Sequence, residues 1–312
     1  MFLKPLINPK PSIIFFFIVF CVLFSLLPLI KFEAGVVFYH TYLHHFVVII
    51  LAVIAPFFLS TGLNNMVYEK SIIQKENLVI GVVFILASSP FINTVEAWLA
   101  SFLLLFLFNF LMQSYQKELP FAQFYNASMI LAGLTFIYPN LILLSFLLII
   151  SGINFNNLSW RIIFTILLGF ITPYVFYFVF SVLLDVDFLL PKFFTFSKIN
   201  FSFFQKASLS IILWGSILMT TILFSFIELF LWLYKKSIKS RRAFMTIIWF
   251  FIICFLIAIY SGWHYFYFSI IPLAIIIGNY FVYTKKRTIA NILFALLLIS
   301  SIYIKCMIVF NV

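Results

Sequence analysis

Residues 208–234 read SLSIILWGSILMTTILFSFIELFLWLY, in which Glu228 is the one charged side chain. As an α-helix this run is long enough to cross a hydrocarbon core of about 30 Å. The next residues, 235–242, read KKSIKSRR, and a second apolar run follows at 244–261. An apolar run that ends in a dense basic cluster is typical of a membrane-spanning helix whose basic end stays in the cytoplasm.

The rest of the chain repeats this pattern. Hydrophobic residues make up 65% of the sequence and charged residues 9%, whereas a soluble domain carries roughly 25% charged residues. The composition predicts an all-α polytopic transmembrane bundle that forms one integral membrane domain over residues 1–312. The predicted spans are 13–30, 43–64, 78–92, 94–113, 125–138, 140–155, 160–184, 208–234, 244–261, 264–283 and 288–310.

Two pairs of these segments are short, so the number of spans lies between nine and eleven. Segments 125–138 and 140–155 meet at Tyr138-Pro139-Asn140 and form either two passes or a re-entrant pair. The Phe- and Lys-containing stretch 185–207 is the longest one without a span. Its composition predicts an interfacial helix or hairpin on the outer leaflet.

The Lys and Arg residues predict the orientation. The clusters 235–242 and 285–287 bracket one helical hairpin, so both are expected in the cytoplasm, with the intervening turn outside. Counting back along the spans places the amino terminus in the cytoplasm, in a bacterial inner membrane. The basic residues expected outside are Lys31, Lys192, Lys198, Lys206 and Lys305.

With this topology the histidines and half of the acidic residues gather at the outer face. We take Glu33, His44 and His264 as candidate catalytic residues, because a carboxylate and an imidazole there can exchange protons with a substrate. A solvated charge beside Lys31 is the alternative for Glu33. The alternative for His40, His44 and His45 is that they lie at the membrane interface with their imidazole groups in contact with water.

Four further residues are candidate substrate contacts, each with a structural alternative. Glu96 opens a predicted helix, where a carboxylate also stabilises the helix dipole. Asp185 lies two residues from Asp187, where the pair could bind a cation weakly, but a polar helix end is the favoured alternative. Trp263 is either an aromatic stacking platform or part of an interfacial aromatic belt. Glu228 lies inside a span, where a carboxylate is costly, and it either serves function or reaches the inner face.

Other functions are excluded or disfavoured by the sequence. The net charge of +11 belongs to residues that flank apolar runs, so we expect no nucleic-acid partner. Walker, Rossmann, nucleophile-elbow and CxxC motifs are absent. Cys21, Cys254 and Cys306 are spread through apolar runs without metal or disulfide spacing. We therefore expect no cofactor and no metal.

The order of several short motifs resembles a known family. These motifs are Leu63-Asn64-Asn65, Tyr125-Asn126-Ala127-Ser128, Leu131-Ala132-Gly133-Leu134, Tyr138-Pro139, Trp160-Arg161, Leu168-Gly169-Phe170 and Pro173-Tyr174. They resemble an uncharacterised family of bacterial multipass inner-membrane proteins with no assigned activity. The chain also has a distant likeness to polytopic glycosyltransferases that use lipid-linked sugars, in which an acidic residue occupies the first outer loop, as Glu33 does here.

Three function classes follow from these observations. The first is a protein that handles a lipid-linked or cell-envelope intermediate at the outer leaflet, as an enzyme or as an accessory. The second is a non-enzymatic membrane subunit that scaffolds a partner. The third is a secondary transporter or permease centred on Glu228. The expected partners are the lipid bilayer and either a lipid-linked intermediate or other membrane proteins.

Overall fold

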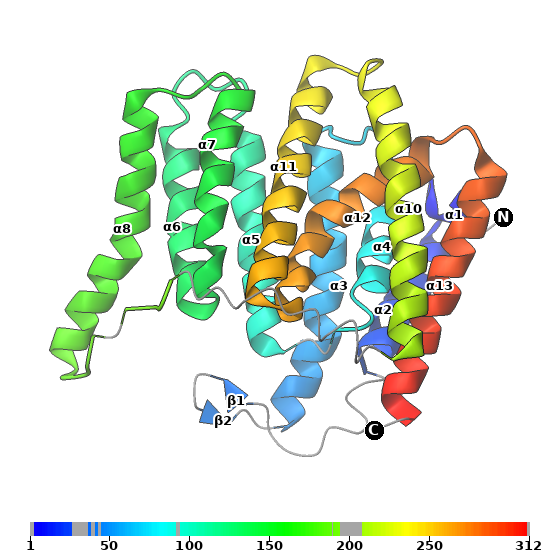
Figure 1. Ribbon diagram of the computed structural model, residues 1–312, viewed down its shortest axis with the longest axis horizontal. Helices are drawn as coiled ribbons and strands as arrows, with labels where there is room; N and C mark the ends of the chain where they lie inside the picture. The colour runs from blue at the N-terminus through cyan, green and yellow to red at the C-terminus, as the bar shows by residue number, and fades with distance from the viewer. Residues whose placement is uncertain are drawn as a thin grey trace. The chain divides into compact units, whose positions relative to one another are not determined.

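The computed structural model describes residues 3–26, 37–38, 41–42, 45–91, 94–188, 190–193 and 208–310 (Figure 1). Nearly all of this part of the chain is helical. Two strands of two residues each, β1 (Val37–Phe38) and β2 (Thr41–Tyr42), pair antiparallel. The all-α prediction is therefore confirmed. Residues 194–207, which hold most of the predicted interfacial stretch, lie outside the described residues.

The chain divides into two compact units. Unit 1 comprises residues 1–99, 201–240 and 270–312, and unit 2 comprises residues 100–200 and 241–269. The helices that lie mainly in unit 1 are α1 (Leu3–Leu6), α2 (Pro11–Leu26), α3 (His45–Glu69), α4 (Val79–Ala87), α10 (Leu209–Leu233), α12 (Phe266–Tyr283) and α13 (Arg287–Phe310). Those mainly in unit 2 are α5 (Val95–Gln113), α6 (Phe121–Ile137), η2 (Pro139–Leu144), α7 (Ser145–Asn154), α8 (Trp160–Leu183), α11 (Ile238–Ser261) and η3 (Trp263–Tyr265).

Seven of the described helices are long and apolar enough to cross a membrane. They are α3, α5, α8, α10, α11, α12 with η3, and α13. The chain is therefore a multi-pass membrane protein by length and composition. The remaining predicted spans fall on shorter helices, namely α2, α4, α6 and η2 with α7.

Helix α4 shows why one predicted span is short. The apolar run suggested residues 78–92, but the helix ends at Ala87. Ser88 and Ser89 follow it, and their hydroxyls donate to the carbonyls of Ile85 and Leu86. Pro90 then blocks any helical continuation, because the residue before a proline avoids the α conformation. At 1.5 Å per residue α4 is about 14 Å long, half of a hydrocarbon core.

Burial distinguishes helices of similar composition. In the most apolar 18-residue stretch of Trp263–Tyr283, which comprises η3 and α12, 94% of the residues are buried inside the protein, whereas only 17% are buried in the corresponding stretch of α8. Helix α12 is therefore surrounded by other helices. Helix α8 packs beside α6 (Figure 1). Most of its apolar side chains are exposed, as those of a lipid-facing helix are.

The contact between α6 and α8 depends on small and polar residues. A Cβ added to Gly169 would lie 2.1 Å from the Ser128 hydroxyl and 2.6 Å from the Tyr125 carbonyl oxygen. Small residues let membrane helices approach closely in this way. Two side-chain hydrogen bonds flank the contact, Tyr125 to Thr172 at 3.0 Å and Thr135 to Tyr174.

The segment around Pro139 forms a turn between two helices. The chain runs along α6, turns through η2 and returns along α7 (Figure 1). Asn140 Nδ2 donates to Ser261 Oγ at 2.7 Å, and Asn154 Nδ2 donates to Thr246 Oγ1 at 3.3 Å. These two bonds hold η2 and α7 against α11 within unit 2.

Candidate functional site

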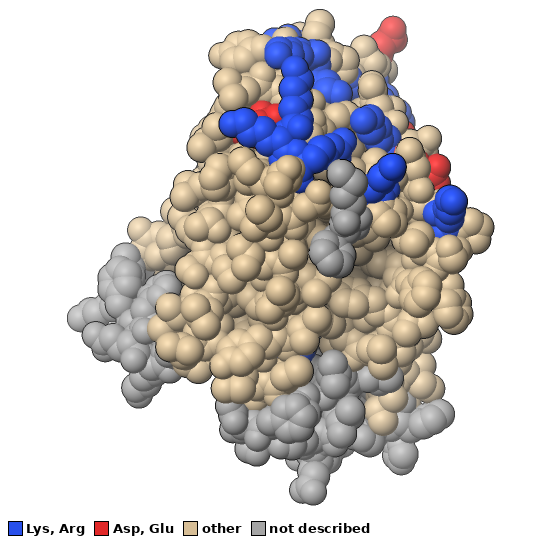
Figure 2. Space-filling view, turned by 90° about the vertical axis from the view of Figure 1, so that its right-hand side faces the viewer, with Lys and Arg blue, Asp and Glu red and all other residues tan. Residues whose placement is uncertain are grey.

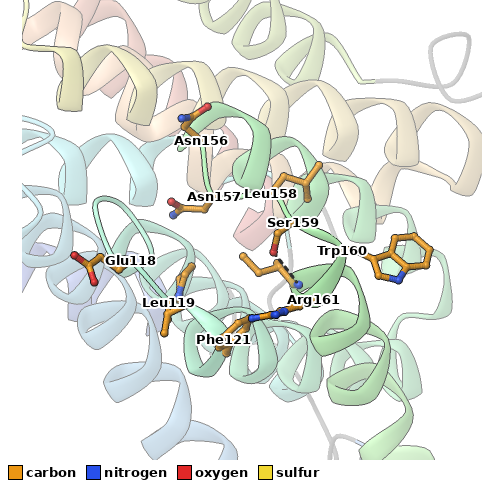
Figure 3. Close-up of a pocket in the computed structure, with 11 residues that line it drawn as sticks. Glu118, Leu119, Phe121, Asn156, Asn157, Leu158, Ser159, Trp160 and Arg161 are labelled. Atoms are coloured by element: carbon orange, nitrogen blue, oxygen red, sulfur yellow. Dashed lines mark hydrogen bonds between the residues drawn. The ribbon is translucent and has the colours of Figure 1, made fainter.

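Two connections between helices border one cavity in unit 2. They are residues 114–120, between α5 and α6, and residues 155–159, between α7 and α8. The cavity has a volume of about 490 Å³ (Figure 3). Its polar lining consists of Glu118, Asn156, Asn157, Ser159 and Arg161.

The α7–α8 connection is shaped by a left-handed residue. Asn156 has a φ of 60°, and the N–H groups of Asn157 and Leu158 both donate to the Gly152 carbonyl, at 2.8 and 3.1 Å. This arrangement closes the end of α7, as left-handed C-terminal caps commonly do. Ser159 then adopts an extended backbone, and its hydroxyl accepts a bond from Ile162 N–H at the start of α8.

One hydrogen bond joins the two connections. The side-chain amide of Asn157 donates to the backbone carbonyl of Ser114 at 2.7 Å. Ser114 in turn donates its hydroxyl to Leu111 at the end of α5. Asn157, which lines the cavity, therefore joins the α7–α8 connection to the α5–α6 connection.

The charges around the cavity are arranged asymmetrically. Helices α6 and α8 both begin at the cavity, and no side chain caps the start of α6. Helix N-termini carry free N–H groups and partial positive charge. Arg161 adds a full positive charge beside them, while Glu118 lies on the other side of the lining (Figure 3).

The cavity rim is apolar and exposed. Trp160 is 70% exposed and Leu119 is 68% exposed. Exposed tryptophan at the end of an apolar helix is typical of the membrane–water interface. The site can therefore receive a molecule whose polar part enters the cavity and whose apolar part lies along the rim.

The charged groups of the lining suit noncovalent binding of a ligand. It contains neither histidine nor cysteine, and its one carboxylate and one guanidinium complement a ligand that carries both signs of charge. Arg161 and the helix N-termini suit a phosphate, and Glu118 suits an ammonium group.

The structure describes part of the outer-face site that the sequence predicted. Glu33 and His44 lie outside the residues whose side chains are described. His264 is exposed in η3. Trp263, beside it, stacks on Phe266 with ring centroids 5.0 Å apart and planes at 2°. The catalytic roles of Glu33, His44 and His264 remain predictions.

The predicted substrate contacts lie on separate elements. In unit 1, Glu96 occupies the first turn of α5, as expected of a helix-stabilising carboxylate, and Glu228 is half-buried within electrostatic range of Tyr280. In unit 2, Asp185 follows α8 with a φ of 50°. None of these residues, nor Trp263 or His264, lines the cavity described above.

Sequence reasoning recognised only part of the cavity. It placed Trp160 and Arg161 at a cytoplasmic helix end but did not select Glu118, Asn156 or Asn157. The sequence did contain one signal for this site. Asn156 and Asn157 are followed by Ser159, a residue type that often caps helix N-termini, and the short polar connection 114–120 lies at the same end of the neighbouring predicted hairpin. Hairpin pairing was needed to bring the two loops together.

The fold and the cavity define a class: a multi-pass, all-helical membrane protein with a polar pocket at the ends of its helices. The chain belongs to a family of unknown function, DUF6427, whose model matches residues 1–311. Its predicted membership of an uncharacterised family is thus confirmed. No curated protein and no solved structure matches the chain.

Proposed function

We propose that this multi-pass protein binds the headgroup of an aminophospholipid in the cavity between the α5–α6 and α7–α8 connections. The carrying observation is that Arg161, two helix N-termini and Glu118 border one cavity with an apolar rim. Arg161 and the N-terminal N–H groups bind the phosphodiester. Glu118 accepts from the ammonium group, and the acyl chains lie against Trp160 and Leu119.

The topology behind this proposal is the one that the sequence predicts. We infer up to eleven passes through a bacterial inner membrane, with the amino terminus and the Arg161 end of α8 in the cytoplasm. Lys and Arg flanking the apolar helices support this orientation. We also infer a single membrane domain, because unit boundaries fall inside α5, α11 and α12 rather than in linkers.

Lipid retention tests the headgroup site. The full-length protein is purified in mild detergent and exposed to phosphatidylethanolamine, phosphatidylcholine or phosphatidylglycerol, and bound lipid is counted by native mass spectrometry. Arg161→Ala should weaken phosphatidylethanolamine binding about tenfold, because a charge-assisted hydrogen bond contributes about 1.5–3 kcal/mol. Glu118→Gln should remove the preference for phosphatidylethanolamine over the other two lipids.

Lys117→Ala is the matched control, since Lys117 is an exposed cation beside Glu118 that does not line the cavity. It should leave binding unchanged. Equal losses in Arg161→Ala and Lys117→Ala would reveal a general charge effect and refute the site. Water-soluble glycerophosphoethanolamine, added as a competitor, distinguishes a lipid ligand from a free headgroup.

A second candidate function is a scaffolding subunit, and the exposed apolar surface of α8 favours it. Phe176 and Val179 lie on this surface and are 60% and 44% exposed. A photo-crosslinking residue at position 176 should capture a discrete membrane protein in native membranes if α8 is an interface. Labelling of lipid alone would leave α8 as a lipid-facing helix and count against the scaffold.

A further inference from the structure

A second cavity lies in unit 1 and has a different character. Its volume is about 410 Å³. Its polar lining consists of Lys4, Asn8, Lys75, Arg287 and Asn291. These residues come from the amino-terminal segment, the α3–α4 connection and the start of α13, so only the folded unit brings them together.

Backbone and side-chain bonds fix the walls of this cavity. Ile7 forms a β-bridge with Asn77. Leu78 N–H donates to the Leu6 carbonyl at 2.9 Å. Leu3 N–H donates to Asn291 Oδ1 at 3.3 Å. The amino-terminal segment is thereby held against both the α3–α4 connection and α13.

The groups that remain available in the cavity are mainly donors. Arg287 donates to the Phe281 and Val282 carbonyls at the end of α12, at 3.4 Å each. A guanidinium has five N–H groups, so further donors remain for a ligand. Asn291 uses its oxygen to accept from Leu3, which leaves its amide N–H groups free to donate.

Lys75 is positioned by an aromatic ring. Its ammonium nitrogen lies 5.3 Å from the centroid of Tyr283, whose hydroxyl accepts from the Gln74 N–H at 3.1 Å. Lys236 lies over the same ring at 4.1 Å. Burial, followed by repulsion from Lys75, lowers the pKa of Lys236. Lys75 and Lys236 therefore place two positive charges close together beside Tyr283 in unit 1.

The described lining of this cavity carries positive charge without a carboxylate. Within the described part of the chain, no Asp or Glu lines the cavity, and Lys4, Lys75 and Arg287 form no salt bridge. Lys and Arg side chains also gather at one end of the helices on the face shown in Figure 2. An anion bound among these cations would reduce their mutual repulsion and accept hydrogen bonds from their unused N–H groups.

We propose that this cavity binds a phosphate group that carries at least two negative charges. Three cations and an amide donor suit a phosphomonoester or a diphosphate better than a zwitterionic headgroup. Basic pockets at the cytoplasmic ends of membrane helices bind anionic headgroups in this manner. The same chemistry is offered by a membrane lipid or by a soluble phosphate compound, and the test below distinguishes these two sources.

Two probes test the site in the full-length protein. Inorganic diphosphate is titrated by isothermal calorimetry in detergent. Separately, micelles are doped with phosphatidic acid or with phosphatidylcholine, and bound lipid is measured by native mass spectrometry. The wild-type protein should bind phosphatidic acid, diphosphate or both, and should not select phosphatidylcholine. Binding of phosphatidic acid alone assigns a lipid source, and binding of diphosphate alone assigns a soluble one.

The double variant Lys4→Ala/Lys75→Ala should weaken binding of the effective probe about tenfold or more. Both lysines are exposed, so the variant should unfold at the wild-type temperature. Lys286→Ala, an exposed neighbour outside the lining, is the matched control and should bind normally. Wild-type protein that binds neither probe would overturn the proposal. So would a double variant that binds like wild type, or a control that loses as much.

The aminophospholipid site is tested independently, because Arg161→Ala leaves this cavity intact. Loss of diphosphate or phosphatidic acid binding in Lys4→Ala/Lys75→Ala, with normal retention of phosphatidylethanolamine, would separate the two sites.

Discussion

Gly169 sets how closely α8 approaches α6. We expect Gly169→Ala to destabilise the protein by about 1–3 kcal/mol, the usual effect of overpacking, because the new methyl group would overlap Ser128 and the Tyr125 carbonyl. Thermal unfolding in detergent, followed by circular dichroism, measures the loss.

Gly133 in α6 supplies the control for this substitution. A Cβ added there meets nothing within 4 Å. Gly133→Ala should therefore leave the unfolding temperature unchanged or raise it, since alanine favours helix over glycine by about 1 kcal/mol. If the two variants unfold together, close approach at Gly169 does not stabilise the α6–α8 pair.

The burial of a single charged side chain is one property that the sequence does not predict. The count of basic residues predicts Lys305 on the outer side, and this placement stays a prediction. Its side chain is 4% exposed, with its ammonium nitrogen 5.8 Å from the ring centroid of Phe24 in α2. Hydropathy along the chain locates a charge on a helix, but only packing determines whether that charge meets water.

At the scale of elements, Asn157 links two helical hairpins. Asn157→Ala removes its bond to the Ser114 carbonyl and should cost about 1 kcal/mol, the usual contribution of one hydrogen bond. The α5–α6 and α7–α8 connections should then separate more readily, and phosphatidylethanolamine retention should fall with the stability. Hydrogen exchange of the 114–120 and 155–159 amides reports the local change.

Asn156→Gly makes a useful comparison, because glycine adopts the positive φ of this position readily. It should preserve both the exchange rates and the lipid binding. A faster exchange in Asn156→Gly than in Asn157→Ala would contradict the role assigned to the inter-loop bond.

Long apolar runs with clear ends were predicted to within a residue. The runs 94–113, 160–184 and 208–234 became α5, α8 and α10. Charged ends were predicted less well: α11 begins at Ile238 rather than at residue 244, because the helix includes Lys239, Arg241 and Arg242. The predicted run 140–155 became two elements, η2, which begins at Pro139, and α7.

At the scale of the whole molecule, orientation is the central prediction. After replacement of Cys21, Cys254 and Cys306 by alanine, a single cysteine at position 264 should react with an impermeant maleimide in intact cells. A cysteine at position 239 should react only after the membrane is opened, because it belongs to the basic cluster 235–242. The reverse labelling pattern would invert the topology.

The two cavities could not be predicted from the sequence, because each unites segments that are distant along the chain. Glu118 meets the residues near Arg161 only through hairpin pairing, and Lys4 meets Arg287 only when the amino-terminal segment docks. The sequence predicts which end of each helix is basic. It does not predict which basic residues share a cavity.

The near-complete enclosure of α12 has a consequence for biosynthesis. This helix has a mean hydropathy of 1.7, high enough to cross a membrane, yet it is made after every other described helix except α13. The helices that surround it cannot close until residue 283 has left the ribosome. The helices made earlier therefore remain incompletely packed in the bilayer until α12 is inserted. A chain that ends before residue 266, as a stalled ribosome would produce, should be degraded rapidly by cellular quality control.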